Sequence, residues 1–151
     1  MKKFELTNEF VTNMFGTKLF RIRALVEFGD VEAGELGGYV EKESNLGHDD
    51  NAWVYDNAWV YGNARVCGDA LVCGNARVCS DEDYAYAHGF GSVNRTTTFF
   101  RLKDGGVGVR CGCFYGTLAQ FRDKIRETHG ETKKAQEYLM LADLMKLRFE
   151  K

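Results

Sequence analysis

Apolar and small residues recur every six positions through the middle of the chain. Read in sixes, residues 51–79 give NAWVYD, NAWVYG, NARVCG, DALVCG and NARVC. Valines and alanines hold equivalent positions: Val54, Val60, Val66, Val72 and Val78, with Ala52, Ala58, Ala64, Ala70 and Ala76. Valine favours strands, and the Gly-Asn and Gly-Asp pairs between units favour tight turns because both residue types tolerate positive φ. Each unit is therefore predicted to be a short strand and a corner, with valine and alanine pointing inward.

Units of this kind cannot bury an apolar face alone, so they are expected to stack into a solenoid with one continuous core. The spacing extends beyond residues 51–79. Val40 and Leu46 fit it two residues out of phase, and Tyr84 and His88 take the places expected after it. Units three apart are expected to stack on one another.

The pattern V-x-G-[ND]-A-x resembles the hexapeptide repeat of left-handed parallel β-helix proteins, in which three hexapeptides make one triangular turn. The left hand is implied by the resemblance only, since crossovers between parallel strands are normally right-handed. The expected fold is mainly β, a short left-handed parallel β-helix of about 2.5–3 coils. The predicted divisions are an N-terminal strand region at 1–38, the β-helix at 39–93, a β-hairpin at 94–116 and a helical hairpin at 117–151.

The segments on either side of the repeat carry ordinary strand and helix patterns. Residues 19–28, LFRIRALVEF, alternate and predict a strand. Residues 97–114 predict a hairpin that turns at Asp-Gly-Gly. A helix at 117–129 begins with a Thr-x-x-Gln capping box, and a second helix is expected at about 132–149. Cys111 and Cys113 share the apolar face of a predicted strand, which favours packing over metal binding.

A closer resemblance covers nearly the whole chain. The stretches LFRIRALVEFGDVEAGELGGYVEKESNL and RCGCFYGTLAQFRDKIRETHG resemble small, mostly uncharacterised phage and prophage proteins that carry such repeats. The resemblance implies a phage setting, hence the host cytoplasm as location and a host protein, such as a component of a defence system, as partner. It implies no activity and no catalytic residue.

Composition and charge argue against several classes of partner and ligand. The net charge of −2 is uneven: residues 1–50 have six Lys/Arg against ten Asp/Glu, whereas residues 93–151 have twelve against seven. This basic excess is too sparse for a nucleic-acid stripe, so nucleic acid is not an expected partner. No apolar run approaches the ~18 residues that span a bilayer. The five cysteines fit no zinc spacing and are expected to be reduced thiols.

The histidines are the candidate catalytic residues, because the resemblance is to a family in which many members are acyltransferases with a histidine base. The candidates are His48, at the register break, and His88, at a late repeat position. No trio of histidines suits a metal, and no phosphate loop or activated nucleophile is recognisable. The chain is therefore expected to be non-catalytic, with no cofactor and no metal; an acyltransferase-like enzyme is the alternative.

Outward positions of the repeat are the expected working surface. If the valines point inward, Trp53 and Tyr55 show on one face, and Trp59, Tyr61 and Arg77 on the next. Exposed apolar patches usually mark contacts, and Arg77 is expected to stack near Trp59. The alternative is that the C-terminal helices of the same chain cover one of these faces.

The second predicted helix carries two apolar stripes. Its main stripe is expected to pack on the solenoid, and the other, Met140, Leu144 and Leu147, against a neighbouring subunit. Together these features predict a non-catalytic, phage-type binding protein, a homo-oligomer of dimer or trimer order. It would bind a host protein, or a small ligand held between subunits.

Overall fold

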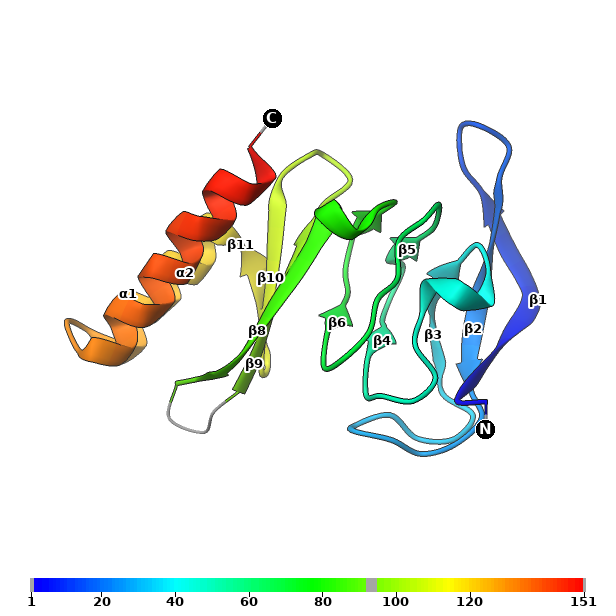
Figure 1. The fold of residues 1–151 in the computed structure, drawn as a ribbon, viewed down its shortest axis with the longest axis horizontal. Helices are drawn as coiled ribbons and strands as arrows, with labels where there is room; N and C mark the ends of the chain where they lie inside the picture. Colours follow the sequence, from blue (N-terminus) through cyan, green and yellow to red (C-terminus); the bar gives the residue numbers. More distant parts are fainter. Residues whose placement is uncertain (1, 92–94, 151) are drawn as a thin grey trace.

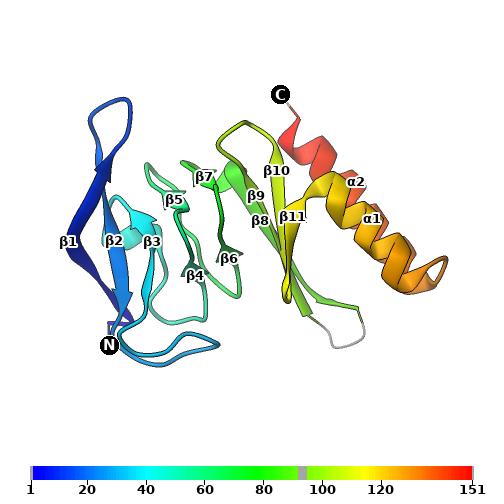
Figure 2. The ribbon, with the colours of Figure 1, turned by 180° about the vertical axis from the view of Figure 1, so that it is seen from behind.

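The described residues form three β-sheets and two α-helices arranged along one long axis. The computed structural model describes residues 2–91 and 95–150. An antiparallel hairpin forms one end, short repeat strands follow, and an antiparallel sheet covered by two helices forms the other end (Figures 1 and 2). The N-terminal elements are β1 (Phe4–Thr12), β2 (Lys18–Ala24), β3 (Leu36–Val40), β4 (Trp53–Val54), β5 (Trp59–Val60), β6 (Leu71–Val72) and β7 (Arg77–Val78). The C-terminal elements are β8 (Tyr84–Phe90), β9 (Arg95–Arg101), β10 (Val107–Cys111), β11 (Phe114–Thr117), α1 (Leu118–His129) and α2 (Lys133–Phe149).

Repeat units three apart do lie beside one another. In the five-stranded sheet, of order β1-β2-β3-β5-β7, β5 pairs with β7 in parallel and Val60 lies opposite Val78. In the two-stranded sheet, β4 pairs with β6 in parallel and Val54 lies opposite Val72. Val40 pairs with Val60, which accounts for the two-residue change of phase before the repeat. The repeat valines and alanines are fully buried, as the six-residue pattern predicts.

The predicted left-handed parallel β-helix is wrong as a description of the fold. The repeat strands are two residues long, and they are divided between a mixed five-stranded sheet and a separate two-stranded sheet. The mixed sheet continues from β3 into antiparallel β2 and β1, so it is no part of a solenoid. Tyr84 and His88, expected to continue the repeat, belong to β8, a seven-residue strand antiparallel to β9.

The repeat ends for a local reason. After Cys79 the Gly-Asn corner is missing, and Ser80 instead caps a 3-10 turn at Asp81–Asp83 by accepting a hydrogen bond from the backbone N–H of Glu82. The chain emerges from this turn into the long strand β8. The predicted boundary between 93 and 94 lies outside the described residues.

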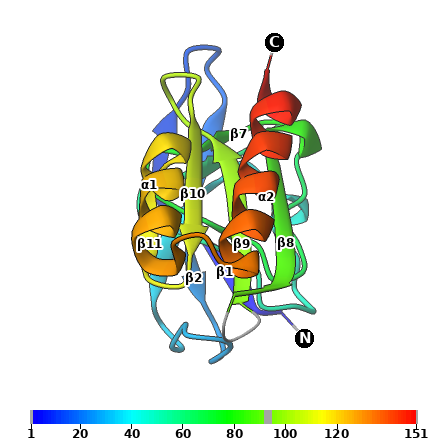
Figure 3. The ribbon, with the colours of Figure 1, turned by 90° about the vertical axis from the view of Figure 1, so that its left-hand side faces the viewer.

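The C-terminal part forms a four-stranded antiparallel sheet, of order β11-β10-β9-β8. Helices α1 and α2 cover one of its faces (Figure 3). The β9–β10 hairpin and both helices agree with the predicted elements, and Thr117 and Gln120 form the predicted capping box. The second hairpin strand, however, ends at Cys111, and Cys113, expected on its apolar face, is exposed before β11. Phe99, Phe121, Tyr138, Ala142 and Met145 contribute to the core between helices and sheet.

The repeat is enclosed between two antiparallel segments. On one side β3 carries β1 and β2; on the other, Tyr84 and Phe100 of the C-terminal sheet belong to the same core as the repeat valines. The hydroxyl of Thr98 accepts the backbone N–H of Leu71 at 3.1 Å. Side chains and strands outside the repeat thus cover both ends of the repeat and pair with backbone groups there. Covering an edge in this way protects unpaired strand groups.

Candidate functional site

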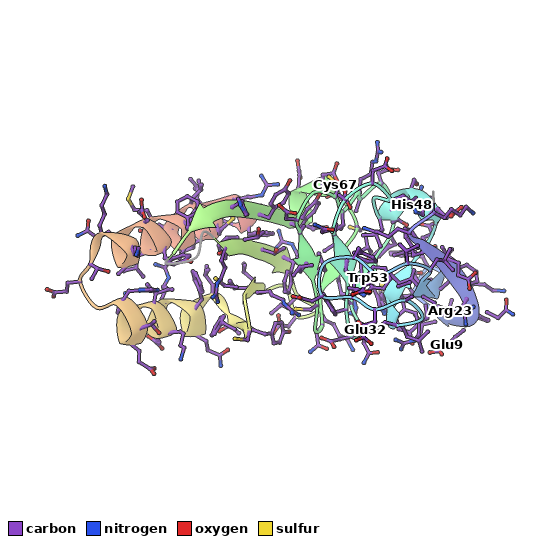
Figure 4. All side chains as sticks on the ribbon, turned by 90° about the horizontal axis from the view of Figure 1, so that it is seen from below. Glu9, Arg23, Glu32, His48, Trp53 and Cys67 are labelled. Atoms are coloured by element: carbon purple, nitrogen blue, oxygen red, sulfur yellow. The ribbon has the colours of Figure 1, made fainter. Side chains whose placement is uncertain are left out.

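Trp53, predicted to face outward on a binding surface, is fully buried. Its ring packs edge-on against Phe28, 5.3 Å away between ring centroids, and against Phe4 at 6.4 Å. Figure 4 shows Trp53 inside the molecule. The prediction of an exposed Trp53 is therefore wrong. The N-terminal region covers Trp53, and the alternative of a cover by the C-terminal helices is wrong for this residue.

Tyr55, from the same predicted face, is half-buried. The guanidinium carbon of Arg110, on β10, lies 4.6 Å from the centre of its ring. Burial raises the pKa of Tyr55, and the Arg110 charge opposes that shift. Because both aromatic residues are covered by other parts of the chain, this face of the repeat is mainly structural.

The second predicted face, by contrast, remains accessible. Trp59, Tyr61 and Arg77 are each partly exposed. The guanidinium carbon of Arg77 lies 4.0 Å from the centre of the Trp59 ring, which confirms the predicted stacking. Trp59 meets Tyr61 edge-on, with ring centroids 6.4 Å apart. The structure thus brings together three of the five predicted binding residues.

Two further residues, which the sequence did not single out, continue the row of paired residues: Arg21, which is partly exposed, and Tyr39, which is buried. Arg21, Tyr39, Trp59 and Arg77 occupy consecutive paired positions on β2, β3, β5 and β7. Arg21 lies 4.4 Å over the Tyr39 ring, as Arg77 lies over Trp59. We call these four residues the Arg–aromatic ladder. The available signal was the dipeptide Tyr39-Val40, which matches Trp59-Val60 in type.

The two arginines of the ladder differ in the groups that contact their guanidinium charge. Arg21 pairs with Glu9 at 2.7 Å and donates to the Tyr39 hydroxyl at 2.6 Å. Arg77 donates to the backbone carbonyls of Ala76 at 2.8 Å and Asn57 at 3.3 Å. In the described part of the chain Arg77 forms no ion pair with a carboxylate. Burial lowers the pKa of Arg77, as expected for a partly desolvated cation without an acidic partner.

A groove of about 650 Å³ adjoins the ladder at Tyr61 and Arg77. Its far wall comes from the C-terminal part of the chain and includes Arg101 and Arg148. Arg101 is neutralised by Asp83 at 3.1 Å. The accessible part of the ladder, Trp59 and Arg77, thus adjoins a groove of mixed charge, whose lining also includes Glu82, Asp83 and Glu150.

His48, the first candidate for an acyltransferase base, is held in a structural role. Its ring stacks on Phe4 with centroids 4.3 Å apart. Its Nδ1 accepts the backbone N–H of Lys3 at 3.0 Å, and its Nε2 faces Glu43 at 3.7 Å. In a neutral imidazole that accepts at Nδ1, the proton resides on Nε2. Neither ring nitrogen then has a free lone pair for a substrate.

His88, the second candidate, is exposed on β8 and its Nδ1 contacts the hydroxyl of Thr96 at 2.7 Å.

The environments of Cys73 and Cys79 disfavour a catalytic thiolate. Burial raises the pKa of Cys73 to about 11, and burial together with the hydrogen bond to Asp83 raises that of Cys79. Both thiols are therefore protonated at neutral pH, and a thiol is a poor nucleophile in that form.

The second stripe of α2 is largely exposed. Met140, Leu144 and Leu147 are 71%, 53% and 67% exposed. The other stripe, with Ala135, Tyr138, Ala142 and Met145, is buried against the sheet. The helix thus presents three large apolar side chains that the described part of the chain leaves largely uncovered.

Comparison with known proteins adds no family assignment: no family model matches the chain, and no curated protein is significantly similar to it. Within residues 2–91 and 95–150, no group of three or more His, Cys, Asp or Glu side chains is placed to hold a metal ion. None of the described helices is long and apolar enough to cross a membrane.

Proposed function

We propose that the protein is a non-catalytic binding protein that engages a partner protein through the Arg–aromatic ladder. The observation that carries this proposal is Arg77, stacked on the partly exposed Trp59 with no carboxylate partner in the described chain. Tryptophan, tyrosine and arginine are the residues most enriched at binding hot spots. A cation already partly desolvated loses less hydration when a partner covers it.

The chemistry of the ladder indicates what the partner supplies. An Asp or Glu side chain would pair with Arg77, and a flat apolar surface would cover Trp59 and Tyr61. The adjoining groove of about 650 Å³ leaves room for a loop of the partner beside these rings. In line with the phage resemblance, the proposed partner is a host protein, met in the host cytoplasm.

A site-specific crosslink tests this proposal. A photoreactive phenylalanine derivative replaces Trp59, and in a control it replaces Tyr115, a 46% exposed aromatic residue on β11. After irradiation in bacterial cells, a discrete protein adduct is expected at position 59 and not at 115. With that partner purified, Trp59→Ala is expected to weaken binding about thirtyfold, the equivalent of 2 kcal/mol. Unchanged affinity of a folded Trp59→Ala protein would contradict the proposal.

We also propose that the protein associates with itself through Met140, Leu144 and Leu147, since these exposed side chains lie on one face of α2. Glu137 lies toward one end of the same helix and Arg148 toward the other. An antiparallel pair of α2 helices would bring each Glu137 near an Arg148 of the partner subunit. Light scattering is expected to show a dimer that Leu144→Glu disrupts and Lys146→Glu leaves intact. A wild-type monomer at micromolar concentration would refute self-association.

The acyltransferase alternative has a weaker basis, because His48 is committed to Lys3 and Glu43. Its test is turnover of acyl-CoA donors with a broad set of acceptors. We expect none. Activity that His48→Ala or His88→Ala abolishes would replace the binding proposal.

A further inference from the structure

The loop between β1 and β2 carries the two most exposed large apolar side chains of the described residues. Met14 is 89% exposed and Phe15 is 85% exposed. Figure 1 shows this hairpin projecting beyond the repeat strands beside it. Apolar side chains scattered singly over a surface are ordinary, whereas neighbouring ones mark contacts with other molecules. We call residues 13–16 the hairpin tip.

Asn13 holds the hairpin tip in one conformation. Its side-chain Oδ1 accepts the backbone N–H of Phe15 at 2.9 Å and that of Thr17 at 3.0 Å. Its backbone carbonyl accepts the N–H of Gly16, and its own N–H donates to the carbonyl of Thr17, both at 3.0 Å. Gly16 has a φ of 83°, which other residues adopt only with strain. The two apolar side chains therefore project from an ordered loop, so little entropy is lost when a partner binds them.

The charges of the hairpin favour a protein over a membrane as the target of its tip. Arg21 pairs with Glu9 at 2.7 Å, and Arg23 pairs with Glu5. Among the described residues of β1, β2 and the tip, this leaves only Lys18 as a cation without an ion pair. A loop that inserts into an anionic membrane needs a cluster of lysines and arginines beside its apolar side chains. One free lysine does not supply that second attraction.

The tip lies on the same sheet as the ladder. Arg21 of the ladder is on β2, three residues from Lys18, where that strand begins. Trp59 is on β5, two strands away from β2. With about 3.3 Å per residue along a strand and about 4.8 Å between strands, the tip is about 20 Å from Trp59. A standard interface covers about 800 Å² on each partner, a patch roughly 30 Å across, so one partner can contact both.

We propose that the hairpin tip is a second anchor for the partner protein of the ladder. An apolar pocket of that partner receives Met14 and Phe15, about 20 Å from the carboxylate that pairs with Arg77. Aromatic residues and methionine are enriched at the centres of protein interfaces. Asn13 is a positioning residue, because it orders the loop that presents the two side chains. This inference rests on the proposed function, since it assigns the tip to the same partner.

Crosslinking at two positions tests whether the tip and the ladder meet one partner. A photoreactive phenylalanine derivative replaces Phe15 in one protein and Trp59 in another, with Tyr115 again as the control. After irradiation in bacterial cells, the same partner is expected in the adducts at 15 and at 59, with no adduct at 115. An adduct at 59 without one at 15 overturns the tip proposal and leaves the ladder intact. An adduct at 15 without one at 59 overturns the proposed function and, with it, the shared contact.

Affinity for the purified partner is the second measurement. Phe15→Ala is expected to weaken binding about tenfold and Met14→Ala about threefold. Thermal melting should not change, because both side chains are exposed. Leu25→Ala is the matched control: Leu25 is 41% exposed and follows the opposite end of β2, so affinity should change less than about twofold. Unchanged affinity of the folded Phe15→Ala and Met14→Ala proteins overturns the proposal.

The positioning role of Asn13 has its own variants. Asn13→Ala removes both hydrogen bonds that the side chain accepts, so the tip must be ordered on binding and affinity is expected to fall about threefold. Asn13→Asp keeps the acceptor oxygen and should restore the affinity. Thr12→Ala, beside these bonds but outside them, should leave it unchanged. Equal affinity of Asn13→Ala and the parent protein would overturn this role.

Two measurements would reveal a different occupant of the tip. The purified protein is expected not to float with vesicles of equal parts phosphatidylethanolamine and phosphatidylglycerol. Vesicle binding that Phe15→Ala abolishes would assign the tip to a membrane and overturn the proposal. Irradiation of the purified protein alone, with the photoreactive derivative at position 15, is expected to give no adduct. An adduct of twice the subunit mass would assign the tip to a second copy of this chain and overturn the proposal as well.

Discussion

Two repeat units share the sequence NAWVY, at 51–55 and 57–61, yet their tryptophans differ in burial. Trp53 is fully buried, whereas Trp59 is partly exposed and carries Arg77 on its face. Both valines are inward and both tryptophans occupy equivalent outward positions. The difference therefore lies entirely in what the rest of the chain places over each unit.

The first unit is covered by the N-terminal region. Phe4 and Phe28 pack on Trp53, and the Lys3 ammonium donates to Asp50 Oδ1 at 3.1 Å and to the carbonyl of Ala52 at 2.7 Å. Over the second unit only β3 and β7 are neighbours, and their side chains, Tyr39 and Arg77, lie beside Trp59 in the sheet. One sequence thus serves as core in one place and as accessible surface in the other.

Substituting the two tryptophans should give the largest difference in stability between the two units. Trp53→Ala is expected to lower the free energy of unfolding by about 3–5 kcal/mol, because it leaves a cavity in the core. Trp59→Ala should cost no more than about 1 kcal/mol, mainly the lost contact with Arg77. Urea unfolding of both variants measures this. Equal losses would mean that Trp59 is also core.

Removing the cover from Trp53 should have the next largest effect. Phe28→Ala is expected to cost about 2–3 kcal/mol, less than a fully buried ring because Phe28 is partly buried. In a Trp59→Phe background, the emission of Trp53 should shift to longer wavelength. Phe15→Ala, at the 85% exposed hairpin tip, serves as the control and should stay within about 0.5 kcal/mol of the parent protein.

The hydrogen bonds of Lys3 to the first unit should contribute less to the free energy of unfolding. Lys3 is buried and its ammonium is fully hydrogen-bonded. Lys3→Met keeps the packing of the stem but leaves the Asp50 carboxylate and the Ala52 carbonyl without this donor, at a cost of about 1–2 kcal/mol. Lys2→Met, whose side chain is 65% exposed, should cost almost nothing. A thermal melt that ranks the two variants in the opposite order would contradict this account.

The smallest effect concerns the second unit alone. Arg77→Gln is expected to lower stability by about 0.5–1 kcal/mol, the usual size of an accessible cation–π contact. Near-ultraviolet circular dichroism should change through Trp59 and not through Trp53. If Trp53→Phe abolishes that spectral change and Trp59→Phe does not, the assignment to Trp59 is wrong.

The local pattern of the sequence was sufficient to predict the buried positions of the repeat and the start of the first helix. The six-residue spacing placed every repeat valine and alanine in the core, and Thr117 with Gln120 began the helix that the structure shows. Such features depend on residues close in sequence, through strand alternation and hydrogen bonds to the nearest backbone N–H groups. Arg77 over Trp59 was also predictable, because the 18-residue offset of stacked units places them side by side.

Tertiary structure alone decided which outward face stays accessible and how the repeat strands divide between sheets. The residues that cover Trp53 lie 25 and 49 positions away, at Phe28 and Phe4, and no local pattern connects them to it. Likewise, Tyr84 fits the repeat spacing but pairs with Phe100 in an antiparallel sheet. Spacing reports which way a side chain points, whereas burial depends on which distant segment packs against it, and that choice is made by the free energy of the whole fold.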